Sequence, residues 1–251
     1  MMELRAWINN ADQLSDAVSC PELGYIYMPL RLAEAVPENE RSRVILLPPE
    51  YLADCEDKVS GMLSELRGAG FSRALAHTAG HIELLRKTGY IIHGGNRLNC
   101  VNSVSLRFYA DCGLADIIVS PELTVRRINA LDRPLPVGFL AYGHIPLMLC
   151  RRCPVSDGKP CGGAKRGKGC EGRITDRTGE KLELLCSENS VEVLNSDVLM
   201  LSDRLGDFRT DFAVLRFTYE NTVRHTVGLY SQNKSSDVKK FTRGLYYRGV
   251  Q

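Results

Sequence analysis

The sequence predicts an α/β fold, a TIM-type (β/α)8 barrel in which eight parallel strands are joined by helices. The length of 251 residues matches the roughly 250 residues typical of such a barrel. Short β-branched or aromatic runs alternate with longer amphipathic stretches, as expected when crossover helices connect parallel strands. Several runs are apolar throughout, which is typical of strands covered on both faces. We therefore expect one domain over residues 1–251.

Eight runs qualify as barrel strands because they are short, apolar and bounded by turn residues. In chain order they are ELRAWI (3–8), GYIYMPL (24–30), RVILLPP (43–49), RALAHT (73–78), YIIHGG (90–95), ADIIVS (115–120), PVGFLAY (136–142) and FAVLRFT (212–218). A regular alternation of apolar and polar residues would instead have indicated an antiparallel sandwich.

Helices are predicted between these strands. In residues 54–68, apolar side chains recur at helical spacing, and Gly68 and Gly70 supply a stop signal. The same reasoning predicts helices over 103–112 and 124–131.

The regular alternation breaks once, in a cysteine-rich insertion at residues 150–186 that follows the seventh strand. Glycine, lysine and arginine crowd this segment, and irregular insertions of this length in compact domains are usually functional. Barrel active sites are assembled from loops at the carboxyl ends of strands. We therefore expect the insertion to cap or flank the mouth of the barrel.

Composition limits the location and the partners of the chain. The formal net charge of +2 is too small to indicate a nucleic-acid binder by itself. The first residues include Glu3, Arg5 and Asp12, which rules out an apolar signal-peptide core there, and no run of eighteen apolar residues occurs. We expect a cytoplasmic protein with neither a membrane nor DNA as partner; the sequence does not identify a partner protein.

Nine cysteines in such a chain are expected to be mostly reduced thiols. Four of them, namely Cys20, Cys55, Cys100 and Cys112, fall in or near predicted helices and strands and are interpreted as core residues.

The other five cysteines lie together as Cys150, Cys153, Cys161, Cys170 and Cys186. Four thiolates suit either a structural zinc or an iron–sulfur cluster, and nearby glycines would let the backbone wrap around a compact centre. Neighbouring lysines and arginines would offset the thiolate charge or face a polyanionic substrate. The alternative is a set of unconnected thiols on a solvated loop. No second C-x2-C is present to pair with that of Cys150 and Cys153 as in a zinc ribbon, so the spacing does not favour zinc.

Five motifs follow one another along the chain: GNRLNCVNS (95–103), SPEL (120–123), the cysteine segment with TDRTG (175–179), VLNS (193–196) and FTRGLYYRGV (241–250). Together they resemble the motifs of the U32 (collagenase-like) peptidase family. The resemblance implies a TIM-type barrel with a [4Fe–4S] cluster on Cys153, Cys161, Cys170 and Cys186, which leaves Cys150 as a neighbour. The family was named for proteolysis, whereas better understood relatives support oxygen-independent hydroxylation of RNA bases or ubiquinone precursors.

Three asparagines follow the YIIHGG strand and are candidates for substrate binding. Side-chain amides of Asn96, Asn99 and Asn102 at a strand's carboxyl end can present donors and acceptors to a substrate. A helix cap is the alternative role for Asn102.

Three further residues are candidates for catalysis. Ser120 and Glu122 follow the ADIIV strand, although S-P-E-L is also typical of the start of a helix. His144 lies between the seventh strand and the insertion, where an imidazole could move protons or bind substrate.

The leading functional hypothesis is an iron–sulfur enzyme that hydroxylates RNA or a small aromatic molecule. A peptide hydrolase is the first alternative, but no G-x-S-x-G elbow or H-E-x-x-H helix supplies its chemistry. A non-catalytic RNA-binding barrel with a structural zinc is the second. Aromatic residues and arginines in the tail, residues 241–248, would contact bases or pack the end of the chain.

Overall fold

The computed structural model describes residues 2–53, 55–156, 158–161, 170–187, 189–236, 238 and 240–249. Eight parallel strands close into a barrel in the order β11-β1-β2-β3-β4-β5-β6-β7, with β7 paired back to β11. They are β1 (Glu3–Trp7), β2 (Leu23–Pro29), β3 (Val44–Leu47), β4 (Arg73–Ala76), β5 (Ile91–Gly94), β6 (Asp116–Ile118), β7 (Val137–Cys150) and β11 (Phe212–Arg216). The predicted fold class and all eight predicted strands are confirmed.

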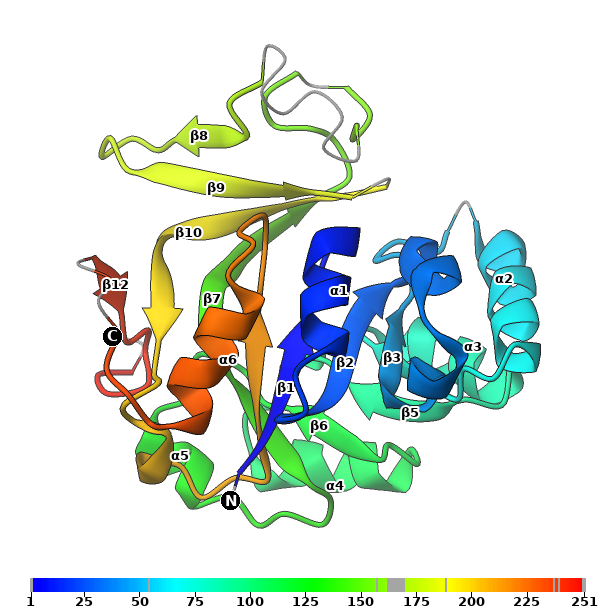
Figure 1. The fold of residues 1–251 in the computed structure, drawn as a ribbon, viewed down its shortest axis with the longest axis horizontal. Coiled ribbons are helices and arrows are strands. Elements are labelled where there is room, and N and C mark those ends of the chain that lie inside the picture. The colour runs from blue at the N-terminus through cyan, green and yellow to red at the C-terminus, as the bar shows by residue number, and fades with distance from the viewer. Residues whose placement is uncertain are drawn as a thin grey trace.

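Helices lie around the outside of the barrel (Figure 1). They are α1 (Ala11–Val18), α2 (Glu56–Gly68), α3 (Ala79–Lys87), α4 (Ser103–Asp111), α5 (Val125–Asn129) and α6 (Val223–Ser231), with short 3-10 helices η1 (Leu30–Ala35), η2 (Glu38–Arg43), η3 (Asn96–Leu98) and η4 (Leu205–Asp207). Several begin where side chains satisfy free backbone N–H groups. Thr78, for example, accepts a hydrogen bond from the backbone N–H of His81 at the start of α3. No helix in the described ranges has both the length and the apolarity to traverse a bilayer.

The core follows from the apolar strands. Residues such as Ile26, Ile45, Ile117 and Val214 are fully buried and form one cluster with the inner faces of the helices. Glycine makes room where two strands approach closely: a Cβ at Gly138 of β7 would lie 2.1 Å from the ring of Phe212 in β11.

The seventh strand does not end where its sequence pattern ends. It continues past Tyr142 to Cys150 and pairs there with the antiparallel strand β10 (Val191–Met200), followed by β9 (Lys181–Cys186) and β8 (Arg173–Thr175). We call residues 144–150 of β7, the strands β8, β9 and β10, and the described residues between these strands the arm. The predicted insertion is therefore partly ordered sheet, and the arm lies over the ends of the barrel strands (Figure 1).

Gly143 makes the passage from barrel to arm possible. Its φ of 108° lies in a region that favours glycine, and a Cβ there would lie 1.9 Å from the carbonyl oxygen of Arg216. The arm is also tied to barrel loops. The Tyr51 hydroxyl donates to the Leu149 carbonyl over 3.3 Å, and the backbone N–H of Cys186 donates to the Tyr219 hydroxyl over 3.0 Å.

The C-terminal segment packs against the base of the arm. Strand β12 (Phe241–Thr242) pairs with β10, and Arg243 forms two hydrogen bonds to the Asp203 carboxylate, at 2.5 and 2.9 Å. The Tyr246 ring is buried against Phe139, and its hydroxyl donates to the Leu140 carbonyl. Packing is thus an observed role for this part of the predicted tail.

Candidate active site at the mouth of the barrel

Five charged or titratable side chains converge at the carboxyl ends of the barrel strands. Glu50 follows β3, His77 follows β4, Arg97 lies in η3 after β5, and Arg216 ends β11. Glu192 comes from β10 of the arm. We call these five residues the mouth cluster. Their position is the one at which barrel enzymes bind substrates.

Glu192 is the centre of the ionic contacts. Its two carboxylate oxygens accept hydrogen bonds from Arg97 and from Arg216. The Arg97 Nε lies 3.6 Å from Glu50, and the His77 Nδ1 lies 3.4 Å from the same carboxyl group. The Arg216 side chain is 3% exposed and that of Glu192 10%, so each charge depends on its partners for the solvation that it has lost.

The two carboxyl groups of the cluster have opposite pKa shifts. Burial raises the pKa of Glu50 to about 7, with a further increase from Glu192 and an opposing effect from Arg97. Burial would also raise the pKa of Glu192, but the guanidinium groups of Arg216 and Arg97 outweigh it and hold that pKa below its usual value. Near neutral pH the site therefore combines an ionised carboxylate with a carboxyl group that can hold a proton.

The histidines of this region are held neutral. Burial lowers the pKa of His77 to about 3 and that of His81 to about 4. The His81 Nδ1 accepts from the backbone N–H of His77, and its Nε2 lies 3.1 Å from the Pro49 carbonyl, so the ring carries its proton on Nε2. His81 thereby fixes the segments that carry Glu50 and His77. Trp7 packs edge-on against the His77 ring at a centroid distance of 5.4 Å.

Several buried polar atoms of the cluster lack a hydrogen-bond partner within the described part of the chain. They are the Glu50 Oε2, both ring nitrogens of His77 and the Arg216 Nε. Unsatisfied buried groups are uncommon in proteins and are costly unless something else pairs with them. The mouth can therefore offer a substrate a protonated carboxyl, a neutral imidazole and a guanidinium N–H.

The cysteines gather in the arm above this cluster. Cys150 and Cys186 both pair with Val191 in the sheet, one on each side of it, and Cys153 is buried against the same residues. The Cys170 sulfur accepts from the Gly172 N–H over 3.4 Å.

The four predicted ligand thiols lie within electrostatic reach of one another. Burial is the largest effect that raises the pKa of the Cys186 thiol, and the neighbouring thiols of Cys161, Cys153 and Cys170 each raise this pKa further. They do not converge on one point, because within the described residues no three His, Cys, Asp or Glu side chains are arranged to hold a single metal ion. Residues 162–169, between Cys161 and Cys170, lie outside the described residues.

The asparagines predicted to bind substrate have different surroundings. Asn96 begins η3 and is 8% exposed, next to Arg97 of the mouth cluster. Asn99 has a positive φ of 49° at the end of η3 and is exposed. Asn102 caps α4 in a capping box with Ser105, which is the structural role considered for it.

The predicted catalytic residues do not form a triad. The Ser120 hydroxyl accepts from the backbone N–H of Glu122, whose side chain is exposed. The His144 Nδ1 lies 2.8 Å from the Asn195 carbonyl, and the Asn195 side chain accepts from the backbone N–H of Ile145. Asn195 and His144 thus shape the irregular pairing of β7 with β10.

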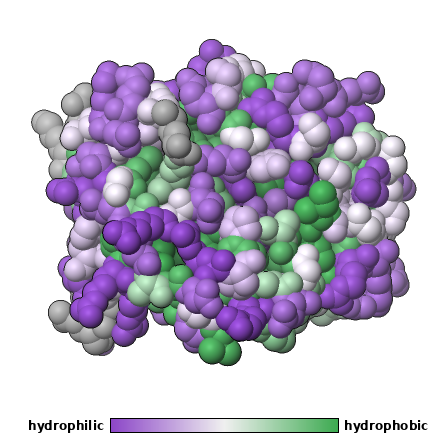
Figure 2. Space-filling view, turned by 90° about the horizontal axis from the view of Figure 1, so that it is seen from below, coloured by the Kyte–Doolittle hydropathy of each residue, from purple (hydrophilic) through white to green (hydrophobic). Residues whose placement is uncertain are grey.

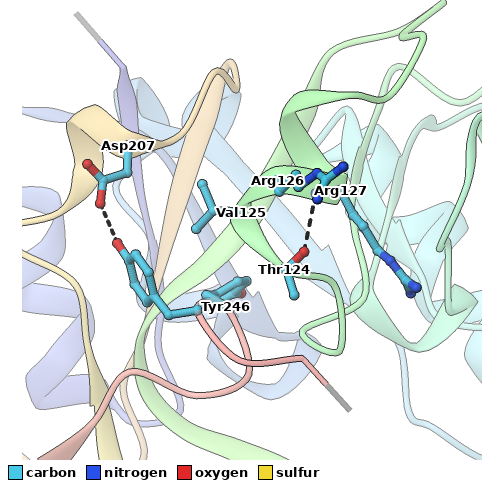
Figure 3. A pocket seen from close by; sticks show the side chains of 7 residues that line it. Thr124, Val125, Arg126, Arg127, Asp207 and Tyr246 are labelled. Carbon is cyan, nitrogen blue, oxygen red and sulfur yellow. Dashed lines mark hydrogen bonds between the residues drawn. The ribbon is translucent and has the colours of Figure 1, made fainter. Parts of the chain in front are cut away.

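A pocket of about 820 Å³ lies elsewhere, between α5, η4 and the C-terminal segment (Figure 3). The Tyr247 hydroxyl donates to the Asp207 carboxylate at its edge over 2.5 Å, and the Thr124 side chain caps α5 through the Arg127 N–H. These polar groups have partners within the chain, in contrast to those of the mouth cluster.

Comparison with models of known protein families finds a match over half of the chain. The model of peptidase family U32 matches residues 45–171, which is half of the chain. The chain belongs to peptidase family U32. The match includes Glu50, His77 and Arg97 of the mouth cluster and three of the four predicted ligand cysteines. A search of curated proteins finds no match to this U32 protein.

A solved structure with the same fold is that of the U32 peptidase Mk0906. It is 11% identical, covers 88% of this chain and 94% of that chain, and has a TM-score of 0.53. Two structures of tryptophan synthase from M. tuberculosis, one in an aminoacrylate-bound form, have TM-scores of 0.48. The aminoacrylate-bound structure is 8% identical, and the match covers 93% of this chain and 94% of that chain. The other is 9% identical, and the match covers 92% of each chain.

Proposed function

We propose that this U32 protein is an iron–sulfur-dependent enzyme that hydroxylates RNA or a small aromatic molecule bound at the mouth of the barrel. The observation that carries the proposal is that four thiols of the arm are electrostatic neighbours: Cys161, Cys153 and Cys170 each act to raise the pKa of Cys186. The arm also reaches the mouth, since Glu192 of β10 binds both arginines there.

The thiol arrangement fits a polynuclear cluster better than a single zinc ion. A zinc ion requires all four sulfurs at about 2.3 Å from one point. A [4Fe–4S] cluster binds each cysteine through a different iron and therefore spaces the sulfurs more widely. Thiols that are electrostatic neighbours, yet are not arranged around one point among the described residues, favour the wider spacing.

In this proposal Cys153, Cys161, Cys170 and Cys186 hold the cluster, which supplies one-electron transfer when it is bound. The mouth cluster binds and orients the substrate. Glu50 holds a proton near neutral pH. Its Oε2 lies 3.6 Å from the Arg97 Nε but has no hydrogen-bond partner in the described structure, so it can donate that proton to a substrate oxygen or nitrogen.

The neutral imidazole of His77 and the guanidinium group of Arg216 complete the substrate contacts. Neither ring nitrogen of His77 has a hydrogen-bond partner in the described structure, although Nδ1 lies 3.4 Å from the Glu50 carboxyl group. The ring can therefore donate one hydrogen bond to a polar ring substituent and accept another. The Arg216 Nε–H is a further donor, held in place by Glu192.

Peptide hydrolysis is a second candidate, and Glu50 is the observation that favours it. A carboxyl group with a pKa of about 7 can act as a general base on a water molecule without any nucleophilic side chain. The family's name also points to this activity.

Metal analysis after anaerobic purification tests the proposal. We expect a brown protein with about four irons and labile sulfide per chain, and loss of both in Cys153→Ala and Cys186→Ala. Cys112→Ala is the matched control, because this half-buried thiol lies at the end of α4, outside the arm, and its iron content should equal that of the wild type. Tight zinc with no iron would contradict the proposal, and peptide turnover that persists in a Cys153→Ala, Cys161→Ala double variant would favour hydrolysis.

A further inference from the structure

A second pocket opens at the opposite end of the barrel, where the strands begin. Its volume is about 350 Å³, and it is lined by residues that include Arg5, Tyr25, Arg73, His93, Asp116 and Phe212. Figure 2 shows the molecule from this side, where hydrophilic residues surround smaller apolar patches. The active sites of barrel enzymes lie at the other end, so this pocket is not explained by the chemistry of the mouth.

Part of the pocket wall is a closed ionic network. The Arg5 Nη1 donates to the Asp116 carboxylate over 2.7 Å and to the Tyr27 hydroxyl over 3.0 Å, and its Nε donates to Glu3 over 2.5 Å. The other Asp116 oxygen lies 2.8 Å from the His93 Nδ1. Arg5, Asp116 and His93 are each at most 5% exposed, so the network is rigid and its carboxylates are already neutralised.

The third carboxylate of the wall is matched as well. Asp211 accepts from the backbone N–H of Val137 over 2.8 Å and pairs with Arg133 at 3.3 Å. The carboxylates that line the pocket are therefore already paired and leave little negative charge to neutralise a further arginine.

Two groups in this pocket remain unmatched. The His93 Nε2 and the Arg73 Nε are buried and have no hydrogen-bond partner in the described structure. Arg73 forms no ion pair with any described residue, and its guanidinium lies over the Tyr25 ring, 4.8 Å from the centroid. A buried imidazole nitrogen and an arginine without a counterion among the described residues thus line the same cavity. A ligand that forms hydrogen bonds with both groups would remove the cost of leaving them unpaired.

We propose that this pocket binds the hydrogen phosphate group of a small molecule. In the neutral tautomer of His93 on which this binding mode depends, the proton lies on Nδ1 toward Asp116, and the Nε2, which has no hydrogen-bond partner in the described structure, carries a lone pair. A P–OH group donates to that lone pair, while the anionic oxygens of the same group accept from the guanidinium of Arg73. The site therefore requires both a proton and a negative charge on one ligand.

The requirement for a proton separates phosphate from sulfate. Sulfate has no O–H at neutral pH, so its oxygens would face the His93 lone pair without a hydrogen between them. Lone pairs brought together in a buried site cost the desolvation of both groups without a compensating bond.

Calorimetric titration of the full chain with inorganic phosphate tests this proposal without any assay of activity. We expect saturable binding at one site, at least about tenfold weaker binding of sulfate, and a loss of about tenfold or more in phosphate affinity for Arg73→Gln. Arg126→Gln removes an exposed arginine from the other pocket and should leave phosphate binding unchanged.

Equal binding of sulfate and phosphate, or undiminished phosphate binding by folded Arg73→Gln, would overturn the proposal. So would the absence of phosphate binding by the wild type at about 10 mM phosphate, tenfold above a Kd of about 1 mM. If Arg73→Gln does not fold, the thermal midpoint of the wild type decides the matter: it should rise with phosphate more than with sulfate at matched ionic strength.

Discussion

Glu192 is the most informative residue to change, because one carboxylate neutralises two arginines at the mouth. Glu192→Gln preserves the shape of the side chain and removes its charge, so Arg97 and Arg216 lose their shared counterion. Removing one partner of a buried ion pair typically costs about 3–5 kcal/mol. The lower value applies here, because the Arg97 side chain is 20% exposed and can recruit water.

A loss of about 3 kcal/mol lowers the melting temperature of a chain of this size by roughly 6–12 °C. The same substitution has a second consequence, since Glu192 contributes to the raised pKa of Glu50. With that charge gone, the pKa of Glu50 should fall and its carboxylate should take over the pairing with Arg97.

Urea unfolding measures the first effect, and carboxyl infrared difference spectra between pH 5 and 8 measure the second. Glu83→Gln is the control, because Glu83 pairs with Arg86 on the exposed surface of α3, and its loss should cost less than about 0.5 kcal/mol. A change below 1 kcal/mol in Glu192→Gln, with an unaltered titration of Glu50, would refute the view that Glu192 organises the mouth.

Two further predictions concern single residues. The pKa of Glu50 is about 7 in the folded chain, above its value in the unfolded chain, so ionisation of this group lowers stability as pH rises from about 4.5 to 7. Glu50→Gln should therefore become more stable than the wild type across that window, by at most about 3 kcal/mol above pH 7. In the arm, Gly143→Ala should cost about 2–4 kcal/mol in urea unfolding, because the added Cβ meets the Arg216 carbonyl at a positive φ.

Each of these has its own control. His77 and His81 have lowered pKa values and add stability as pH rises from about 3 or 4 toward 6.5, which opposes the effect of Glu50. The difference in unfolding free energy between the wild type and Glu50→Gln isolates the contribution of this carboxyl group. A difference that does not change with pH would disprove the raised pKa of Glu50.

The control for Gly143→Ala is Gly228→Ala, which lies in open space within α6 and should stabilise the chain by about 0.5–1 kcal/mol. Equal effects of the two glycine substitutions on unfolding free energy would exclude the proposed clash at Gly143.

The barrel could be predicted because its strands are apolar on both faces, and such runs stand out in a sequence. The arm could not. Residues 144–150 include Pro146 and follow a run that already looks complete, while the partner strand β10 was recognised only as a motif around Asn195. Its pairing is long-range and irregular, with register breaks on both sides of Leu194, and local sequence does not encode such breaks.

The mouth cluster was missed for a related reason. The signal, a polar residue just after a predicted strand, was present at Glu50, His77 and Arg97, but we applied it to asparagines and to Ser120 and Glu122. Glu192 could not have been found in this way, because it reaches the mouth from the arm rather than from a barrel loop.

The position of Glu192 in β10 has one more consequence. Val191 lies in register between Cys150 and Cys186, and Glu192 is the next residue along the chain. A single peptide unit therefore separates Val191, the residue paired with both cysteines, from the carboxylate on which both arginines depend. We expect a chemical change at Cys150 or Cys186, such as oxidation, to shift this stretch of β10 and with it the ion pairs at the mouth of the barrel.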